Sequence, residues 1–282
     1  MRIISAKKIR DTVSDLCLKA NLFLREDVLV ALKSAYLNEA NKKAKDILQV
    51  IIKNALIAGR EKLAICQDTG LPCVFVEIGE NVKVSGNLKN SINKGVDLGY
   101  KKGSFRSSVI KDPLSRGKPG YQPAIIHIDM AKGNKIKLTV LPKGFGCENK
   151  VQLRMFKPTA SIVEIKKFIV QAVKDAGSDA CPPYVVGVGI GGTADYACFL
   201  AKKALLKKFR ISGYPGNRLS GVRRLEYDLL TMINKLNIGP MGLGGKTTAL
   251  AVNIETQPTH IAGLPVCVNI SCHALRSASE II

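Results

Sequence analysis

The sequence has no tryptophan, only three histidines and no pair of cysteines in C-x-x-C spacing. The sequence therefore lacks the motifs of Cys2His2 and repeated zinc-ribbon sites. No stretch approaches the roughly 18 consecutive apolar residues of a membrane-spanning helix. The basic N-terminal residues pass straight into an amphipathic pattern, without the apolar segment and cleavage site of a secretory signal. We therefore expect a cytoplasmic protein with no membrane partner.

Acidic residues are also scarce, because 22 aspartates and glutamates stand against 43 lysines and arginines, a net charge of +21. Such an excess is typical of nucleic-acid-binding proteins. The lysines, however, are scattered over helix-like segments, and no basic run is interleaved with aromatic residues. We expect no nucleic-acid partner and keep a basic nucleic-acid-binding module as a distant alternative. A basic chain equally attracts small dicarboxylate anions or an acidic partner subunit.

The composition is that of a globular protein, since 46% of the 282 residues are hydrophobic, enough for a sizeable core. Apolar residues at helical spacing predict two or three helices within residues 1–58. Later patterns predict a strand at 74–78, a helix at 87–101, a loop at 104–122, a β-hairpin of 124–130 with 135–142, a glycine turn at 143–150, a helix at 161–176, a strand, glycine turn and helix within 181–209, a loop at 210–221, a helix at 222–236, and strands at 247–255 and 264–271.

No internal repeat or low-complexity linker divides the chain. We therefore predict an α+β fold: a single mixed helix/sheet domain over residues 1–282, with a helical N-terminal lobe.

Two glycine motifs resemble nucleotide-binding sequences. Gly187, Gly189 and Gly192 satisfy G-x-G-x-x-G between a predicted strand and a helix. A dinucleotide site also needs an acidic residue about 20 positions later, where this chain has only lysine, phenylalanine and arginine. We therefore favour tight strand-to-helix packing through glycine over nicotinamide binding.

The second motif, GPMGLGGKTT, lies at 239–248 and departs from a P-loop by one position. A P-loop that ends at Lys246 would need glycine at 240, where this chain has Pro240. It would also follow a strand, whereas this motif precedes one. We therefore expect no nucleotide hydrolysis here.

Three of the eight cysteines stand in turn-like surroundings: Cys66 in ICQDTG, Cys181 in DACPPY and Cys272 in NISCHA. Thiolates suit iron–sulfur clusters, and three of them on a four-iron cluster leave one iron open to substrate. Buried structural cysteines are the alternative, because free cysteines are among the most buried residues. The same reasoning assigns four further cysteines to the core: Cys17, Cys73, Cys198 and Cys267.

Four long motifs resemble the N-terminal portion of the class I, iron–sulfur fumarate hydratases and the related L-tartrate dehydratase α subunits. They are ICQDTG at 65–70, CPPYVVGVGIGGT at 181–193, IGPMGLGGKTTAL at 238–250 and THIAGLPVCVNISCHALR at 259–276. The motifs come in order and extend over most of the chain. The resemblance implies that Cys66, Cys181 and Cys272 bind a 4Fe-4S cluster whose fourth iron takes substrate.

The resemblance also implies substrate contacts. Gln67 and Asp68 match residues that face the substrate, Arg106 in SFRSS matches a carboxylate-binding arginine, and His260 matches a substrate-contacting histidine. One departure concerns Cys147, which lies in GFGCEN where fumarase-like chains usually have serine. Cys147 could compete as a cluster ligand or be a spectator.

The motifs GCENK and THIAGLPVCVNISCH look more like fumarases than tartrate dehydratases. We therefore favour reversible hydration of fumarate to (S)-malate, with L(+)-tartrate dehydration as the alternative. In single-chain class I fumarases a C-terminal domain carries the catalytic base. The resemblance thus implies that this chain is the α subunit of a hydro-lyase active only with a separate β subunit, in an α2β2 assembly, on a small dicarboxylate.

Overall fold

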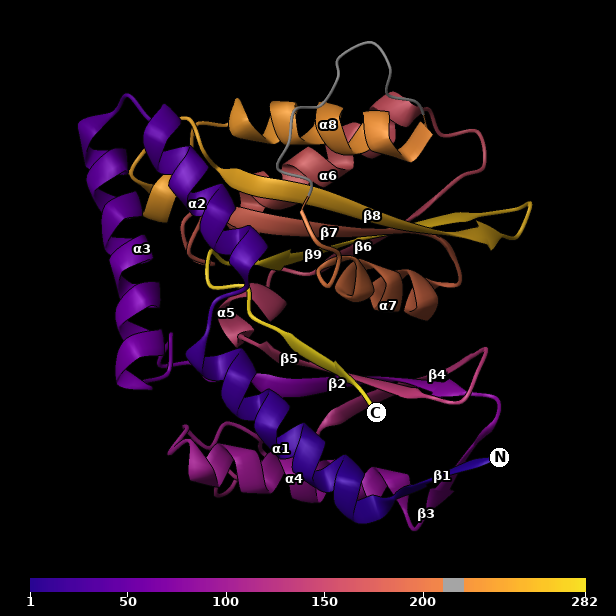
Figure 1. Cartoon of the computed structure of the whole chain (residues 1–282). Helices are drawn as coiled ribbons and strands as arrows, with labels where there is room; N and C mark the ends of the chain where they lie inside the picture. The colour runs from indigo at the N-terminus through magenta and orange to yellow at the C-terminus, as the bar shows by residue number, and fades with distance from the viewer. Residues whose placement is uncertain (210–220) are drawn as a thin grey trace. The chain divides into compact units, whose positions relative to one another are not determined.

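The computed structural model describes residues 1–209 and 221–282, which form two compact units (Figure 1). Unit 1 comprises residues 1–25, 54–145 and 276–282, and unit 2 comprises residues 26–53 and 146–275. Helices and mixed sheets occur in both, so the predicted α+β class is confirmed. The predicted loop at 210–221 lies outside the described residues except for Gly221. None of the described helices combines the length and apolar composition needed to span a bilayer.

The predicted N-terminal helices are present and are shared between the units. Helix α1 (Ala6–Leu22) belongs to unit 1, and α2 (Glu26–Asn38) belongs to unit 2. Helix α3 (Lys42–Glu61) contributes residues to both.

Unit 1 contains a four-stranded mixed sheet in the order β10-β5-β2-β4. Its strands are β2 (Leu71–Gly79), β4 (Ile125–Ala131), β5 (Ile136–Lys143) and β10 (Ala278–Ile281). Strands β1 (Arg2–Ser5) and β3 (Val82–Ser85) pair in parallel, and helix α4 spans Leu88–Lys102.

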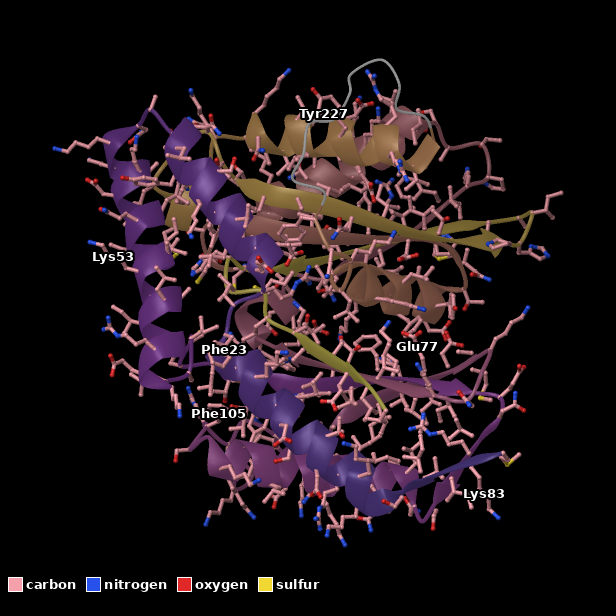
Figure 2. The ribbon with its side chains drawn as sticks, viewed as in Figure 1. Phe23, Lys53, Glu77, Lys83, Phe105 and Tyr227 are labelled. Atoms are coloured by element: carbon pink, nitrogen blue, oxygen red, sulfur yellow. The ribbon has the colours of Figure 1, made fainter. Side chains whose placement is uncertain are left out.

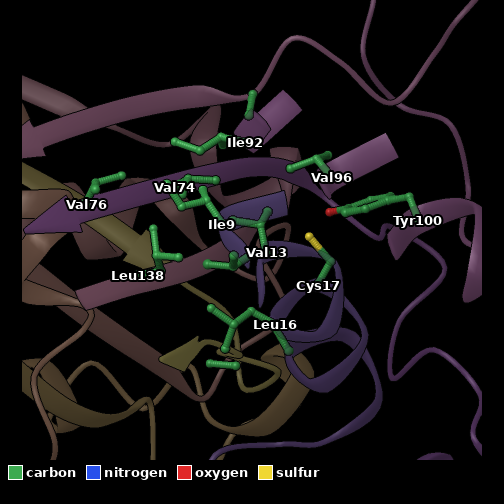
Figure 3. Packing of buried hydrophobic residues seen from close by; sticks show 14 of the residues in the cluster. Ile9, Val13, Leu16, Cys17, Val74, Val76, Ile92, Val96, Tyr100 and Leu138 are labelled. Atoms are coloured by element: carbon green, nitrogen blue, oxygen red, sulfur yellow. The ribbon is translucent and has the colours of Figure 1, made fainter. Parts of the chain in front are cut away.

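The core of unit 1 lies among α1, α4 and the central strands (Figure 3). Ile9 and Val13 of α1, Val74 of β2, and Ile92 and Val96 of α4 are fully buried there. Burying such a side chain stabilises the fold by about 1.5–3 kcal/mol. The helical spacing found in the sequence thus reflects real core faces.

The predicted hairpin of 124–130 with 135–142 is wrong in its pairing, although both strands exist. Strand β2 lies between them, parallel to β4 and antiparallel to β5. The turn after β2 donates backbone hydrogen bonds of 2.8–2.9 Å from residues 79–81 to carbonyls of the 131–135 connection. Because β2 is almost wholly buried, it takes a neighbour on each side, which local sequence cannot reveal.

Unit 2 contains a second four-stranded mixed sheet, in the order β6-β9-β7-β8. Its strands are β6 (Gln152–Phe156), β7 (Tyr184–Gly192), β8 (Ala249–Thr259) and β9 (Leu264–Ser271). Strand β7 lies between β8, to which it is parallel, and β9, to which it is antiparallel. Strand β2 of unit 1 has the same relation to β4 and β5. The helices are α5 (Phe145–Glu148), which begins at the end of unit 1, α6 (Ile162–Ala176), α7 (Ala194–Ala204) and α8 (Gly221–Asn234).

Helices cover both faces of this sheet, with α6 and α8 on one face and α7 on the other (Figure 1). Val186 and Val188 of β7 face the core formed with α6 and α8. The alternate residues, Gly187 and Gly189, face α7 so closely that an added Cβ would lie 2.1 Å from the Ala201 oxygen or 2.0 Å from the Ala197 oxygen. The prediction that these glycines serve strand-to-helix packing is confirmed.

Candidate functional site

The segment Cys66–Gly70, here called the Cys66 loop, connects α3 to β2 in unit 1. Cys66 and Asp68 are half-buried, and Gln67 is exposed. The Asp68 carboxylate is oriented by two backbone amides, since Oδ1 accepts from Gly70 N at 2.9 Å and Oδ2 from Phe145 N at 2.9 Å. A thiol, an amide and an oriented carboxylate are thus presented by consecutive residues.

Thr69 ties this loop to the predicted carboxylate-binding arginine. Its hydroxyl Oγ1 donates to the backbone oxygen of Arg106 at 2.9 Å. The Arg106 side chain is exposed, so its planar guanidinium is available to a carboxylate. Unit 1 therefore brings together the segments that carry three predicted substrate-binding residues: Gln67, Asp68 and Arg106.

A buried tyrosine of α4 anchors the Cys66 loop through a hydrogen bond. The Tyr100 hydroxyl donates to the Thr69 carbonyl at 2.8 Å. Burial raises the pKa of Tyr100, so the hydroxyl stays protonated as a donor. Phe105, labelled in Figure 2, packs edge-on against Tyr100 with ring centroids 5.6 Å apart.

Sequence reasoning missed Arg276, whose Nη2 donates to the backbone oxygen of Asp68. Arg276 is 4% exposed, unusually buried for an arginine. The only available signal was its position at the end of the fourth motif, four residues after Cys272.

In unit 2, Cys181 and Cys272 meet at one end of the sheet. Cys181 precedes β7, and Cys272 follows β9, which runs antiparallel to β7. His273 links them, because its backbone N donates to Cys181 O at 3.3 Å and its ring Nδ1 lies 3.0 Å from the same oxygen. Since a carbonyl only accepts, the Nδ1 contact is a hydrogen bond when that nitrogen carries the proton. His273 is a second residue whose contact was not predicted from the sequence.

The backbone at Cys181 has a φ of 56°, in the left-handed region that favours glycine. A non-glycine residue there costs roughly 1–2 kcal/mol, and such strain is often found at functional sites. Cys147 lies beside this segment, and its Sγ contacts the Ala180 oxygen at 3.4 Å. Cys147 is itself buried in the unit 2 core.

His260 lies elsewhere in unit 2. It is exposed in the connection between β8 and β9, at the Gly192 end of β7, whereas Cys181 and Cys272 lie at the Tyr184 end. Nine residues of strand separate the two ends by roughly 26 Å. Unit 2 therefore does not bring His260 to these thiols, and its contact with substrate stays a prediction.

Burial distinguishes three of the four cysteines assigned to the core from the three predicted ligands, whereas Cys198 does not differ from the ligands in this respect. Cys17, Cys73 and Cys267 are buried, as predicted for core residues, and Cys198 is half-buried against the cluster that contains Cys267. Burial raises the pKa of Cys267, which disfavours the thiolate form that binds metal. The three predicted ligands are all half-buried.

Among the described residues, neither unit by itself holds three or more His, Cys, Asp or Glu side chains grouped to bind a metal ion. Two predicted ligands come from unit 2 and the third, Cys66, from unit 1. Soft donors in turns, two of them at one end of a sheet, fit the chemistry of an iron–sulfur cluster.

Backbone amides of the P-loop-like motif donate hydrogen bonds to side chains of the same chain. Lys246 N donates to the carboxylate of buried Glu39 at 2.7 Å, and Gly245 N donates to Asn237 Oδ1 at 3.1 Å. The backbone amides that would bind a phosphate are thus already engaged.

Comparisons with known proteins identify the family of this chain. A protein-family model described as "Fumarate hydratase (Fumerase)" matches residues 10–280. A Methanocaldococcus jannaschii protein named "Putative L(+)-tartrate dehydratase subunit alpha" is 42% identical over 279 residues, 96% of each chain. The "L(+)-tartrate dehydratase subunit alpha" of Escherichia coli K12 is 26% identical over 282 residues, 99% of this chain and 92% of that protein.

Proposed function

Because the chain belongs to the fumarate hydratase (Fumerase) family, we propose that it is the α subunit of an iron–sulfur hydro-lyase that reversibly hydrates fumarate to (S)-malate. The reaction adds the elements of water across the carbon–carbon double bond. The observation that carries this proposal is the family match over nearly the whole chain, together with the convergence of Cys181 and Cys272 at one end of the unit 2 sheet.

The proposed cofactor is a 4Fe-4S cluster held by Cys66, Cys181 and Cys272. When bound, it supplies a Lewis-acidic iron with an open position for substrate oxygen. The chain's own task is to hold the thiols. His273 fixes the Cys181 backbone, and the Cys66 loop is held through Tyr100 and Arg276. Cys147 is proposed as a spectator, because its thiol is buried in the core beside Ala180.

The substrate's carboxylates are proposed to bind groups of unit 1. Arg106 offers two parallel donors to one carboxylate, and the Gln67 amide offers further hydrogen bonds. The Asp68 carboxylate, fixed by two backbone amides, can accept a hydrogen bond from a substrate hydroxyl or a water molecule. The catalytic base is proposed to lie on the β subunit.

Tartrate is the second candidate substrate, and the names of the relatives favour it. The family description and the motifs GCENK and THIAGLPVCVNISCH favour fumarate. Both reactions need a site that binds the two carboxylates of the substrate and places its hydroxyl at the open iron. The relatives' designation as α subunits supports a separate β partner, and we propose an α2β2 assembly.

The test is anaerobic expression of the chain alone and with its β subunit, followed by reconstitution with iron and sulfide. Fumarate absorbance is then followed after addition of (S)-malate, and L(+)-tartrate dehydration is assayed in parallel. We expect turnover of malate only when both chains are present. Turnover of tartrate alone would change the substrate, and failure to bind iron and sulfide under either condition would refute the proposal.

Cysteine variants assign the ligands. Cys66→Ala, Cys181→Ala and Cys272→Ala should each abolish activity and lower the iron content. Cys267→Ala is the matched control, because its thiol is buried in the core, and it should keep the cluster. A Cys267→Ala protein that loses the cluster would show that the ligand assignment is wrong.

A further inference from the structure

Arg276 is a buried cation whose surroundings do not neutralise it. Its side chain is 4% exposed, and within residues 1–209 and 221–282 no carboxylate forms an ion pair with it. Its Nε is buried and has no hydrogen-bond partner there. A buried guanidinium without a counter-charge is costly, so its presence indicates an anion that the chain by itself does not supply.

Among the described residues, this guanidinium makes one hydrogen bond, and that bond is directed at the Cys66 loop. Nη2 donates to the Asp68 carbonyl, while Tyr100 donates to the next carbonyl, that of Thr69. Two buried donors thus hold consecutive carbonyls of the loop that carries Cys66. Only one of these donors is charged.

We propose that Arg276 is a positioning residue that fixes the Cys66 loop and places a positive charge beside the anionic cluster and substrate. This inference rests on the proposed function and extends it to a residue that contacts neither substrate nor reacting atoms. Its action runs through the Asp68 backbone. The anion that compensates the guanidinium is the cluster with its thiolate ligand Cys66.

The first test uses the chain without a cluster. Amide hydrogen exchange of the peptide containing Gly70 is compared in the unaltered chain, Arg276→Met and Arg276→Lys, with Tyr100→Phe as the matched control. Arg276→Met and Tyr100→Phe each remove one hydrogen bond to the loop, so we expect exchange at least about tenfold faster in both. Arg276→Lys should lie between. Circular dichroism and the melting temperature establish that each variant is folded.

The second test uses the reconstituted complex with the β subunit and measures the reduction potential of the cluster by electron paramagnetic resonance. Removing a positive charge near a cluster disfavours its reduction. Arg276→Met should therefore lower the potential, whereas Tyr100→Phe and Arg276→Lys should leave it close to that of the unaltered enzyme. A merely structural role predicts equal shifts in Arg276→Met and Tyr100→Phe, and that result would overturn the inference.

Unchanged exchange in Arg276→Met would also overturn it. If Arg276→Met does not fold, the Lys variant decides. A reduction potential and a turnover close to those of the unaltered enzyme in Arg276→Lys support the charge role, and loss of turnover at unchanged potential contradicts it. The two proposals fail separately. An unaltered complex that binds no cluster refutes the proposed function, whereas an active complex insensitive to Arg276→Met refutes only the inference.

Discussion

The contact between β7 and α7 allows one substitution to be followed from geometry to stability. Gly189→Ala would place a Cβ 2.0 Å from the Ala197 oxygen and 2.7 Å from the Ala201 nitrogen, both backbone atoms. Real Cβ atoms almost never come within 3.0 Å of another heavy atom, so α7 must move away from β7 by about 1 Å or more. That movement loosens the buried Ala197, Leu200 and Ala201.

Overpacking of this kind costs about 1–3 kcal/mol, and the upper end applies because the obstacle is backbone rather than a flexible side chain. A loss of about 3 kcal/mol lowers the melting temperature by roughly 6–12 °C in a protein of this size. Urea denaturation and thermal melting measure the effect.

Gly263→Ala is the matched control in unit 2, since its added Cβ meets only the Met155 methyl at 3.8 Å. It should change the free energy of unfolding by less than about 0.5 kcal/mol. If Gly189→Ala unfolds at the same urea concentration as the control, the packing explanation of the glycine motif is wrong.

Three further substitutions test local features. Ser161→Ala removes the capping box of α6 and should cost about 0.5–2 kcal/mol in urea denaturation. The hydrogen bond from Lys166 lowers the pKa of Asp228, so its stabilising contribution is complete above about pH 4 and is lost as the pH falls further. Asp228→Asn should therefore flatten the acid limb of a plot of melting temperature against pH, and an unchanged limb would contradict this. Gly70→Ala combines a φ of 75° with a Cβ 2.8 Å from backbone atoms, so it should lower both the melting temperature and the iron content. Gly117→Ala is its control, because the residue has a φ of 71° but open space around its Cβ. It should lower the melting temperature by a few degrees and leave the iron content unchanged.

Local sequence signals were sufficient where the structure is locally determined. The helix at 161–176 carries its own capping serine and terminal glycine, and it forms as α6 with Gly177 as its C-cap. The pairing of β4 and β5 with β2 could not be predicted in the same way, because it depends on which strand is apolar enough to occupy the centre of a sheet.

The same limit applies to the candidate site. The three cysteines were predicted from their turn-like surroundings and from the family motifs, whereas Arg106 was predicted only from the resemblance of SFRSS to the family. Arg276 and His273 act through backbone carbonyls of distant segments, and an isolated arginine or histidine does not reveal that its partner is a carbonyl more than 90 residues away.

Strand β10 pairs with β5 although 134 residues, including most of unit 2, lie between them in the sequence. During synthesis, β5 must therefore wait with one unpaired edge until the chain of unit 2 has been made. An open strand edge can pair with another chain, and long-range pairing of this kind slows folding. Aggregation of the newly made chain should thus depend on how quickly β10 reaches the open edge of β5.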